Sequence, residues 1–364
     1  MMMLSNLLPT PYIIINIMPI ARLKIKGKDL TPQKAIKNPL LGSKNVLTNS
    51  RWEFVALWLK KEKKDSALFY WNQANEFYKS SVGVNIYTAP LLHYYCFMNA
   101  TKALLTSKNI IFNHYHGVKH SGISSSRFTL QNEGIEIKSN GILPSLSTYF
   151  NETETSTVHS LQEIFFNLQF IHRTYCLSYP RQTDMFIPVK NVFFYYDLST
   201  NEVRLYCELS EDFSNRNILK RLPSTFIFDR KEKERYFIKS NGSTTISNPT
   251  KPSVSDINNL INFNEALRKD LVFINGSSTL WYIKSNVRGP AKIDRKSSTL
   301  TLGAMHRLSE LCRYKPLEFR KFMDSDKNWL INEFIQQSSE QFLDEIASEI
   351  TGYHFLIPNI RSAK

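Results

Sequence analysis

The sequence predicts an α+β protein, mainly a helical bundle formed by the N- and C-terminal segments, with an antiparallel β-rich segment inserted between them. Apolar residues recur at helical spacing before about residue 110 and after about residue 300. Runs that alternate apolar and polar residues, typical of strands, dominate the stretch 184–284. Because helices and strands segregate along the chain instead of alternating, the pattern argues against a doubly wound parallel sheet.

These patterns divide the 364 residues into four parts. Residues 1–20 are expected to form a tail, 21–125 an N-terminal helical part, 126–299 the β-rich insert with one long helix near 158–177, and 300–364 the C-terminal helices that complete the bundle. The tail is apolar, but it contains three prolines and lacks a basic stretch before its apolar part. We therefore expect neither a signal peptide nor a membrane-spanning segment there.

The strongest helical signal covers residues 89–105. Pro90 suits the first turn of a helix, where its missing N–H costs nothing. Apolar residues occupy most faces of this helix, so we expect it to be buried on most sides. Asn99 and Lys102 are polar exceptions three positions apart, so they share a face. They predict a polar pocket or, in the simpler interpretation, an interhelical hydrogen bond for Asn99 and a solvent-facing Lys102.

Further helices and strands follow from the same two periodicities. Helical spacing predicts additional helices over 51–59, 66–78, from about 300 to a break at Pro316, and over 328–349, where Gly352 can cap the last one. Alternation predicts one hairpin from 127–131 and 134–138, further strand pairs at 192–196 with 203–209 and at 225–228 with 236–239, and a strand over 280–284.

The chain is strongly basic, with 46 Lys and Arg against 32 Asp and Glu and a net charge of +14. This balance favours anionic partners, with RNA or DNA first. The basic stretch with Arg288, Lys292, Arg295 and Lys296 is predicted to contact nucleic-acid phosphates. A Lys-rich composition also arises from the base composition of some genomes, and this alternative stays open. No phosphate-binding glycine motif is present, so we predict no nucleotide cofactor and no other cofactor.

Cysteines and histidines do not predict a metal site. The four cysteines are far apart and form no CxxC motif, which favours free thiols in a reducing cytoplasm. His114, His116 and His120 lie within seven residues, but the surrounding sequence offers no cysteine or carboxylate to complete a zinc site. We therefore predict no bound metal.

Several motifs in the helical parts resemble those of one known family. They comprise Ala67, Gln73-Ala74, Phe77-Tyr78, Pro90-Leu91-Leu92, Tyr94-Tyr95, Lys102-Ala103-Leu104-Leu105 and His116-Gly117, and a second block from His306 to Pro316 followed by Trp329. On these residues the chain resembles the YaaC-like family of bacterial proteins, and its helices in turn resemble those of the HEPN superfamily. The resemblance covers most of the chain from about residue 40.

The HEPN resemblance implies a function connected with RNA or with defence, since such proteins are often ribonucleases, toxins or defence proteins. Catalytic HEPN domains carry an Arg followed, after four to six residues, by a His. None of the eight histidines here has an Arg at that distance upstream. The first hypothesis is therefore a cytoplasmic binding component, in antiphage defence, whose partner is RNA, DNA or a protein encoded beside it.

Two other classes of function stay open. The first is a noncanonical RNase-like nuclease or toxin, with His116 or His306 as the acid–base group and Arg313 stabilising phosphate charge. His306 and Arg313 are seven positions apart, which places them on one helix face. The second is a structural dimerisation module, because HEPN-like helices often pair into homo-oligomers. The catalytic residues are candidates only, and whether the protein is an enzyme is left open.

Overall fold

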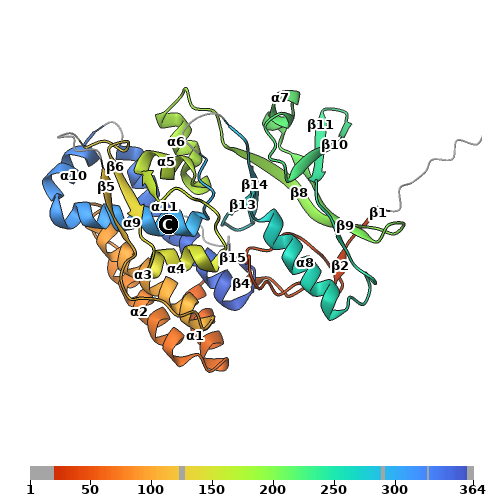
Figure 1. The fold of residues 1–364 in the computed structure, drawn as a ribbon, viewed down its shortest axis with the longest axis horizontal. Coiled ribbons are helices and arrows are strands. Elements are labelled where there is room, and N and C mark those ends of the chain that lie inside the picture. Colours follow the sequence, from red (N-terminus) through yellow and green to blue (C-terminus); the bar gives the residue numbers. More distant parts are fainter. Residues whose placement is uncertain (1–19, 123–127, 288–291, 326–327, 359–364) are drawn as a thin grey trace, which may run out of the picture.

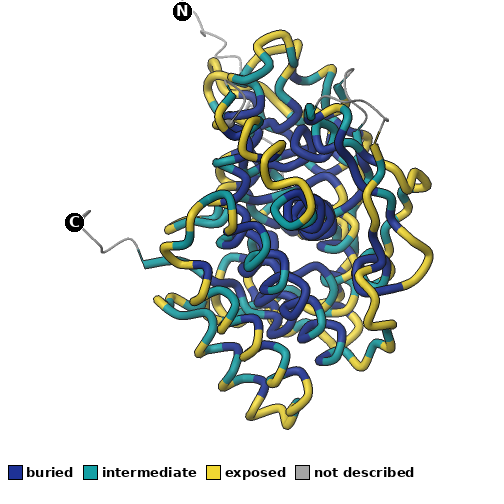
Figure 2. Tube along the Cα trace, turned by 90° about the vertical axis from the view of Figure 1, so that its left-hand side faces the viewer, coloured by how far each residue is buried: buried dark blue, intermediate teal, exposed yellow. Residues whose placement is uncertain are grey.

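Two hydrophobic cores organise the molecule, one among the helices and one on the sheet. The computed structural model describes residues 20–122, 128–287, 292–325 and 328–358. Most helices gather on one side, and a twisted antiparallel sheet lies on the other together with α7 Arg216–Leu219 and α8 Val254–Leu267 (Figure 1). Buried segments lie inside, with exposed loops around them (Figure 2). This mixed arrangement with antiparallel sheets confirms the predicted α+β class.

The helices come from both ends of the chain and from its middle. They are α1 Arg51–Lys61, α2 Asp65–Ser81, α3 Ala89–Ser107, α4 Ile142–Tyr149, α5 Leu161–Phe166, α6 His172–Ser178, α7 Arg216–Leu219, α8 Val254–Leu267, α9 Ser297–Tyr314, α10 Pro316–Met323 and α11 Asn328–Thr351, with 3₁₀ turns at Gln169–Ile171 and Glu211–Phe213.

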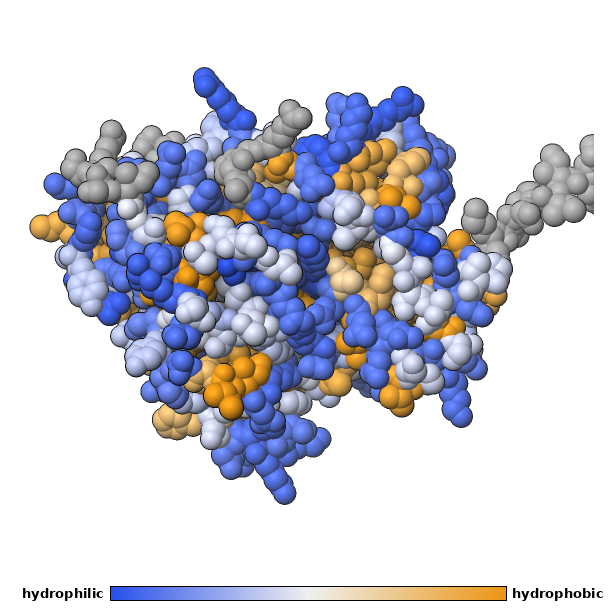
Figure 3. All heavy atoms as spheres, in the orientation of Figure 1, coloured by the Kyte–Doolittle hydropathy of each residue, from blue (hydrophilic) through white to orange (hydrophobic). Residues whose placement is uncertain are grey.

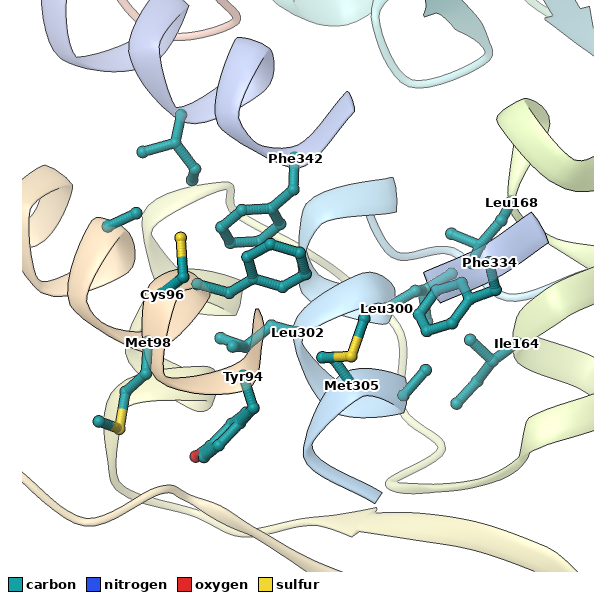
Figure 4. Close-up of a cluster of buried hydrophobic side chains, with 14 of the residues drawn as sticks. Tyr94, Cys96, Met98, Ile164, Leu168, Leu300, Leu302, Met305, Phe334 and Phe342 are labelled. Atoms are coloured by element: carbon teal, nitrogen blue, oxygen red, sulfur yellow. The ribbon is translucent and has the colours of Figure 1, made fainter. Parts of the chain in front are cut away.

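Helix α3 is the most enclosed of the N-terminal helices. It packs against α2, α9 and α11, and thirteen of its nineteen residues are buried. Phe97 of α3 stacks on Phe342 of α11 with ring centroids 4.3 Å apart. The same cluster includes Leu302 and Met305 of α9 (Figure 4). The expectation that α3 is buried on most sides is confirmed.

The large sheet is antiparallel throughout, in the order β10-β11-β9-β8-β14-β13. Its strands are β8 Phe186–Asp197, β9 Glu202–Leu209, β10 Phe226–Glu232, β11 Arg235–Ser240, β13 Leu271–Ile274 and β14 Leu280–Lys284, with β1 Ile20–Arg22 added to β8 and β12 Thr244–Thr245 added to β9. Smaller sheets pair β5 Val118–Gly122, β6 Glu133–Ile137 and β7 Val158–Ser160; β2 Lys24–Ile25 and β3 Lys28–Asp29; and β4 Val46–Leu47 and β15 Phe355–Leu356.

The strand pairs predicted from 192 to 239 are confirmed, because β8 pairs with β9 and β10 with β11. The predicted hairpin of 127–131 with 134–138 is wrong in its first strand. The partner of β6 on that side is β5, which precedes it by a longer connection. The turn before β6 instead lets Thr129 O accept hydrogen bonds from the backbone N–H groups of Asn132 and Glu133.

The single helix predicted near 158–177 is also wrong, because the structure breaks it. Residues 158–160 form a strand, and Ser160 and Glu163 form a capping box that starts α5. Asn167 then ends α5. Its Nδ2 donates to Glu163 O, and its Oδ1 accepts a hydrogen bond from Ile293 N–H, 126 residues away. This tertiary contact fixes the break, and the chain continues through a 3₁₀ turn into α6.

A buried ion pair joins the N-terminal segment to α11. Lys34 Nζ lies 2.9 Å from Asp344 Oδ2, and both side chains are fully buried. The same ammonium donates to Asn275 Oδ1 and to Phe355 O. Four separate parts of the chain therefore meet at one ammonium group.

The substitution Lys34→Met is expected to lower the free energy of unfolding by up to about 3–5 kcal/mol, because the buried Asp344 carboxylate loses its nearer cation and keeps only Arg51, at 3.5 Å. Urea unfolding measures the change. Lys79→Met removes an exposed pair with Glu76 and serves as the control, with an expected change below about 1 kcal/mol. Equal effects of the two substitutions would contradict the importance of the Lys34 contacts.

Candidate site around His116 and His306

Three rings from distant parts of the chain meet beside α3, and we call them the histidine cluster: Tyr94, His116 and His306. Ring centroids are 4.9 Å apart for Tyr94 and His306, 5.4 Å for the two histidines and 5.5 Å for Tyr94 and His116. Tyr94 lies on α3, His306 on α9, and His116 in the connection between α3 and β5. The packing of α3 against α9, together with the loop that follows α3, therefore brings together two of the three predicted catalytic candidates, His116 and His306.

Tyr94 links the buried part of the cluster to its exposed part. The side chain is 2% exposed, and its hydroxyl points away from the surrounding apolar residues (Figure 4). The hydroxyl lies 2.5 Å from Nδ1 of His116. Burial raises the pKa of the Tyr94 phenol, so it keeps its proton. In the tautomer that accepts this proton at Nδ1, the neutral His116 ring carries its own proton on Nε2.

The backbone after His116 requires glycine. Gly117 has φ +74°, in the left-handed region, and a Cβ there would clash with Pro144 of α4. Leu143 N–H donates to His116 O, which ties the loop to the start of α4. The His116-Gly117 pair is therefore a tight turn that holds the His116 ring against Tyr94.

His306 is the buried member of the cluster. It is 3% exposed, and its Nδ1 has no hydrogen-bond partner and lies 3.9 Å from a carboxylate oxygen of Glu310. Burial is the main cause that lowers the pKa of His306 to about 3, and the positive charge of Arg313 adds to it. His306 is therefore neutral at pH 7.

Two cations act on the cluster from outside. Burial lowers the pKa of His116, and the charges of Arg313 and Lys102 lower it further. Within the described part of the chain, neither cation has an acidic partner within 4.0 Å: Arg313 Nε donates to Ser309 O, and the Lys102 ammonium lies 5.5 Å from the centroid of the Tyr70 ring. The site therefore combines neutral imidazoles with positive charge that no carboxylate pairs directly.

The carboxylate of Glu133, close to the histidine cluster, is paired with side chains outside the cluster. Glu133 of β6 accepts from Arg307 Nη2 at 2.5 Å and lies 3.2 Å from His120 Nε2. Arg307 also contacts Glu310 at 3.0 Å. The sequence pattern did not identify Tyr94, Glu310 or the Glu133–Arg307 pair as part of a site. The spacing of His306 and Glu310, four positions apart on one helix, was an available signal.

The other predicted polar residue on α3 stays apart from these contacts. Asn99 is buried, its Nδ2 donates to Tyr95 O, and its Oδ1 has no hydrogen-bond partner. A pocket shared by Asn99 and Lys102 stays a prediction.

The predicted basic loop is only partly a surface. Arg288 lies outside the described residues. Lys292 pairs with Asp270 at 2.8 Å. Arg295 is buried and pairs with Glu152 at 3.2 Å, and Lys296 donates to Arg268 O. Arg295 is therefore not available for surface contacts with phosphates, and the role of the stretch in nucleic-acid binding stays a prediction.

One group of side chains has the spacing of metal ligands. His172 Nε2 lies 3.3 Å from Cys176 Sγ and 3.7 Å from Asp184 Oδ1. The same nitrogen accepts a hydrogen bond from Met185 N–H at 2.9 Å, which occupies the lone pair that a metal would need. Burial raises the pKa of Cys176 to about 12, so its thiol is protonated. These contacts favour a hydrogen-bonded cluster over a metal site.

Comparison with known proteins gives one positive result. A family model described as YaaC-like Protein matches residues 39–350. The search of curated proteins gave no significant match. The search of solved structures likewise gave none. Within the described residues, no helix has the length and apolar character needed to cross a membrane.

The substitution Arg313→Gln is expected to raise the pKa of His116, because it removes a positive charge that disfavours the imidazolium. Histidine-selective NMR titration measures the change. Arg320→Gln on α10 removes an equal charge that pairs with Asp324, and this control is expected to leave His116 unchanged. An unaltered His116 titration in Arg313→Gln would show that the two groups are not coupled.

Proposed function

This chain belongs to the YaaC-like family, and from that premise we propose that it binds the phosphate backbone of RNA at the histidine cluster. The observation that carries the proposal is a pair of cations, Lys102 and Arg313, which have no carboxylate partner among the described residues and act on the exposed ring of His116. Ammonium, guanidinium and imidazole N–H groups all donate to phosphate oxygens. The residues that act on His116, together with its own ring, thus offer three kinds of donor to an anion.

The charge state of the cluster supports an anionic ligand. The pKa of His116 and that of His306 both lie below the ordinary histidine value, with Arg313 contributing to both shifts. A phosphate bound between the cations would offset this positive potential and would raise the pKa of His116. The net charge of +14 adds long-range attraction for polyanions.

Surface composition is compatible with this role. Hydrophilic residues cover most of the face seen in Figure 3, and hydrophobic residues form scattered patches on it. The HEPN-like resemblance of the helices supports RNA as the first polymer to test.

Membership of a cytoplasmic defence system with a protein partner rests on the same resemblance, and co-purification with the products of adjacent genes tests it. Homo-oligomer formation also rests on it, and a monomer in light scattering at micromolar concentration would contradict it.

Retention of single-stranded RNA at low ionic strength is expected, with affinity that falls as salt rises. Lys102→Ala and Arg313→Ala should each weaken binding about three- to tenfold and reduce the slope of log affinity against log salt by about 1. Fluorescence anisotropy measures both quantities. Lys79→Ala on α2 is the control, since Lys79 already pairs with Glu76. Absence of RNA binding by the unmodified protein in 50 mM salt would refute the proposal.

A second candidate function, RNA cleavage, is favoured by the contact between the His116 and His306 rings. In this hypothesis His116 exchanges the proton of the attacking or leaving oxygen, Arg313 stabilises the developing phosphate charge, and Tyr94 orients His116. The buried His306 then acts as a positioning residue, because it is 3% exposed and lies against the rings of Tyr94 and His116. The chemistry needs no metal ligand and differs from the HEPN Arg–His motif, which is absent.

Cleavage of a labelled RNA by the wild-type protein is expected to fall at least a hundredfold in His116→Ala, since positioned acid–base groups contribute about 10²–10⁴-fold. His306→Asn should reduce the rate less and shift its pH profile. His114→Ala, an exposed histidine two residues from His116, is the matched control and should keep the full rate. Undiminished cleavage by His116→Ala would exclude it as the acid–base group.

A further inference from the structure

A second polar site lies inside the molecule, where the start of α9 meets the end of α8 and strand β14. A cavity of about 30 Å³ is enclosed there, which corresponds to room for roughly two or three water molecules. Its lining includes Arg268, Lys284, Arg295, Lys296 and Ser298. We call this space the α9 cavity.

Three donor atoms that line the α9 cavity have no partner among the described residues. Nε of Arg268, Nε of Arg295 and Oγ of Ser298 are buried and make no hydrogen bond to that part of the chain. The three residues are at most 9% exposed. An unsatisfied buried donor is unfavourable, and more so when the group is charged. Three such donors around one space indicate that a hydrogen-bond acceptor belongs in it.

Three cations that line the α9 cavity, Arg268, Lys284 and Lys296, lack carboxylate partners within the described residues. Lys284 Nζ donates to Ile293 O at 2.6 Å, and Lys296 Nζ donates to Arg268 O at 2.9 Å. Neither of these lysines nor Arg268 forms an ion pair within the described residues. Burial is the main cause that lowers the pKa of Lys284 to about 7 and that of Lys296 to about 8. An anion bound in the cavity would raise both pKa values and so keep both lysine side chains in the charged ammonium form.

The carboxyl groups nearby are already engaged. Glu345 accepts from Ser297 Oγ and Gln341 Nε2, and Glu349 accepts from Ile36 N–H and Tyr149 O–H. Burial raises the pKa of both acids, which favours their neutral forms. The other cationic side chains that line the cavity form ion pairs with carboxylates, namely Lys34–Asp344, Lys269–Asp294 and Arg295–Glu152.

The N-terminus of α9 adds a fixed positive potential. Ser298 lies in the first turn of this 18-residue helix, and its N-cap residue Lys296 provides no side-chain cap. The helix dipole at this end favours an anion, and the Glu152 carboxylate, which accepts from Lys296 N–H and Thr299 Oγ1, already offsets part of that potential. Exposed Lys269 also lines the cavity and marks its side toward solvent.

We propose that the α9 cavity binds one free oxoanion of the phosphate class, held by Arg268, Arg295 and Ser298 and neutralised by Lys284 and Lys296. The donors are of the types that recognise tetrahedral oxoanions elsewhere. The small volume restricts the ligand to the oxoanion itself and excludes a nucleotide. This site is separate from the histidine cluster and does not depend on the proposed RNA binding.

Titration calorimetry with inorganic phosphate, at ionic strength held constant with chloride, tests the proposal on the full chain. The unmodified protein is expected to bind one phosphate, and phosphate should raise its thermal unfolding temperature more than chloride does. Ser298→Ala should weaken binding about tenfold through loss of one hydrogen bond to the anion. Lys284→Met should abolish it. Ser348→Ala, another buried serine with an unpartnered hydroxyl, is the matched control and should bind as the unmodified protein does.

The double variant Lys102→Ala, Arg313→Ala separates this site from the RNA site, because it should keep one phosphate per chain while losing RNA affinity. Circular dichroism of each variant verifies that it is folded, and Ser298→Ala alone decides the outcome if Lys284→Met unfolds. Absence of phosphate binding by the unmodified protein would overturn the proposal. Equal affinities of Ser298→Ala and Ser348→Ala, or competition by ATP with equal affinity, would also overturn it.

Discussion

Helix α3 is buried on most sides, and its burial determines where the neighbouring helices lie. A helix that is apolar on most sides must be covered on most sides, and here the cover comes from α2, α9 and α11. The stacking of Phe97 on Phe342 fixes α3 against the C-terminal helix. Because α9 is held in the same layer, His306 is brought to Tyr94, more than two hundred residues away in sequence. The candidate site is therefore a direct consequence of how the core is covered.

Helix α9 contributes residues to two different polar sites at different positions along its length. At its start, Ser298 faces an enclosed cavity with excess cationic donors. Further along, His306 contributes a buried neutral ring to a cluster whose other histidine reaches the surface. The positive charge of Arg313, near the end of the helix, contributes to lowering the pKa of both histidines. One helix thus carries residues of both proposed sites, and we expect changes in its position to affect them together.

Much of the fold could be predicted from local sequence pattern, because helical spacing and strand alternation report burial directly. The prediction failed where a distant contact decides the local structure. Asn167 ends a helix because its amide binds the backbone of Ile293, and no local pattern contains that information. Helix α8 was missed, although Ser253 and Asp256 form a capping box ahead of its apolar residues. Arg295 was taken for a surface group, because basic residues usually are, and it proved to be buried.

Coupling of Tyr94, His116 and His306 within one site is tested most directly by the ring NMR spectrum of the Tyr94→Phe variant. This substitution removes the hydroxyl that bonds His116 Nδ1 and keeps the ring that packs on His306. We expect a changed tautomer balance and titration for His116, a smaller shift for His306, and no change for His159, which lies on β7. Spectra in which His116 is unaffected would show that the three side chains are not coupled.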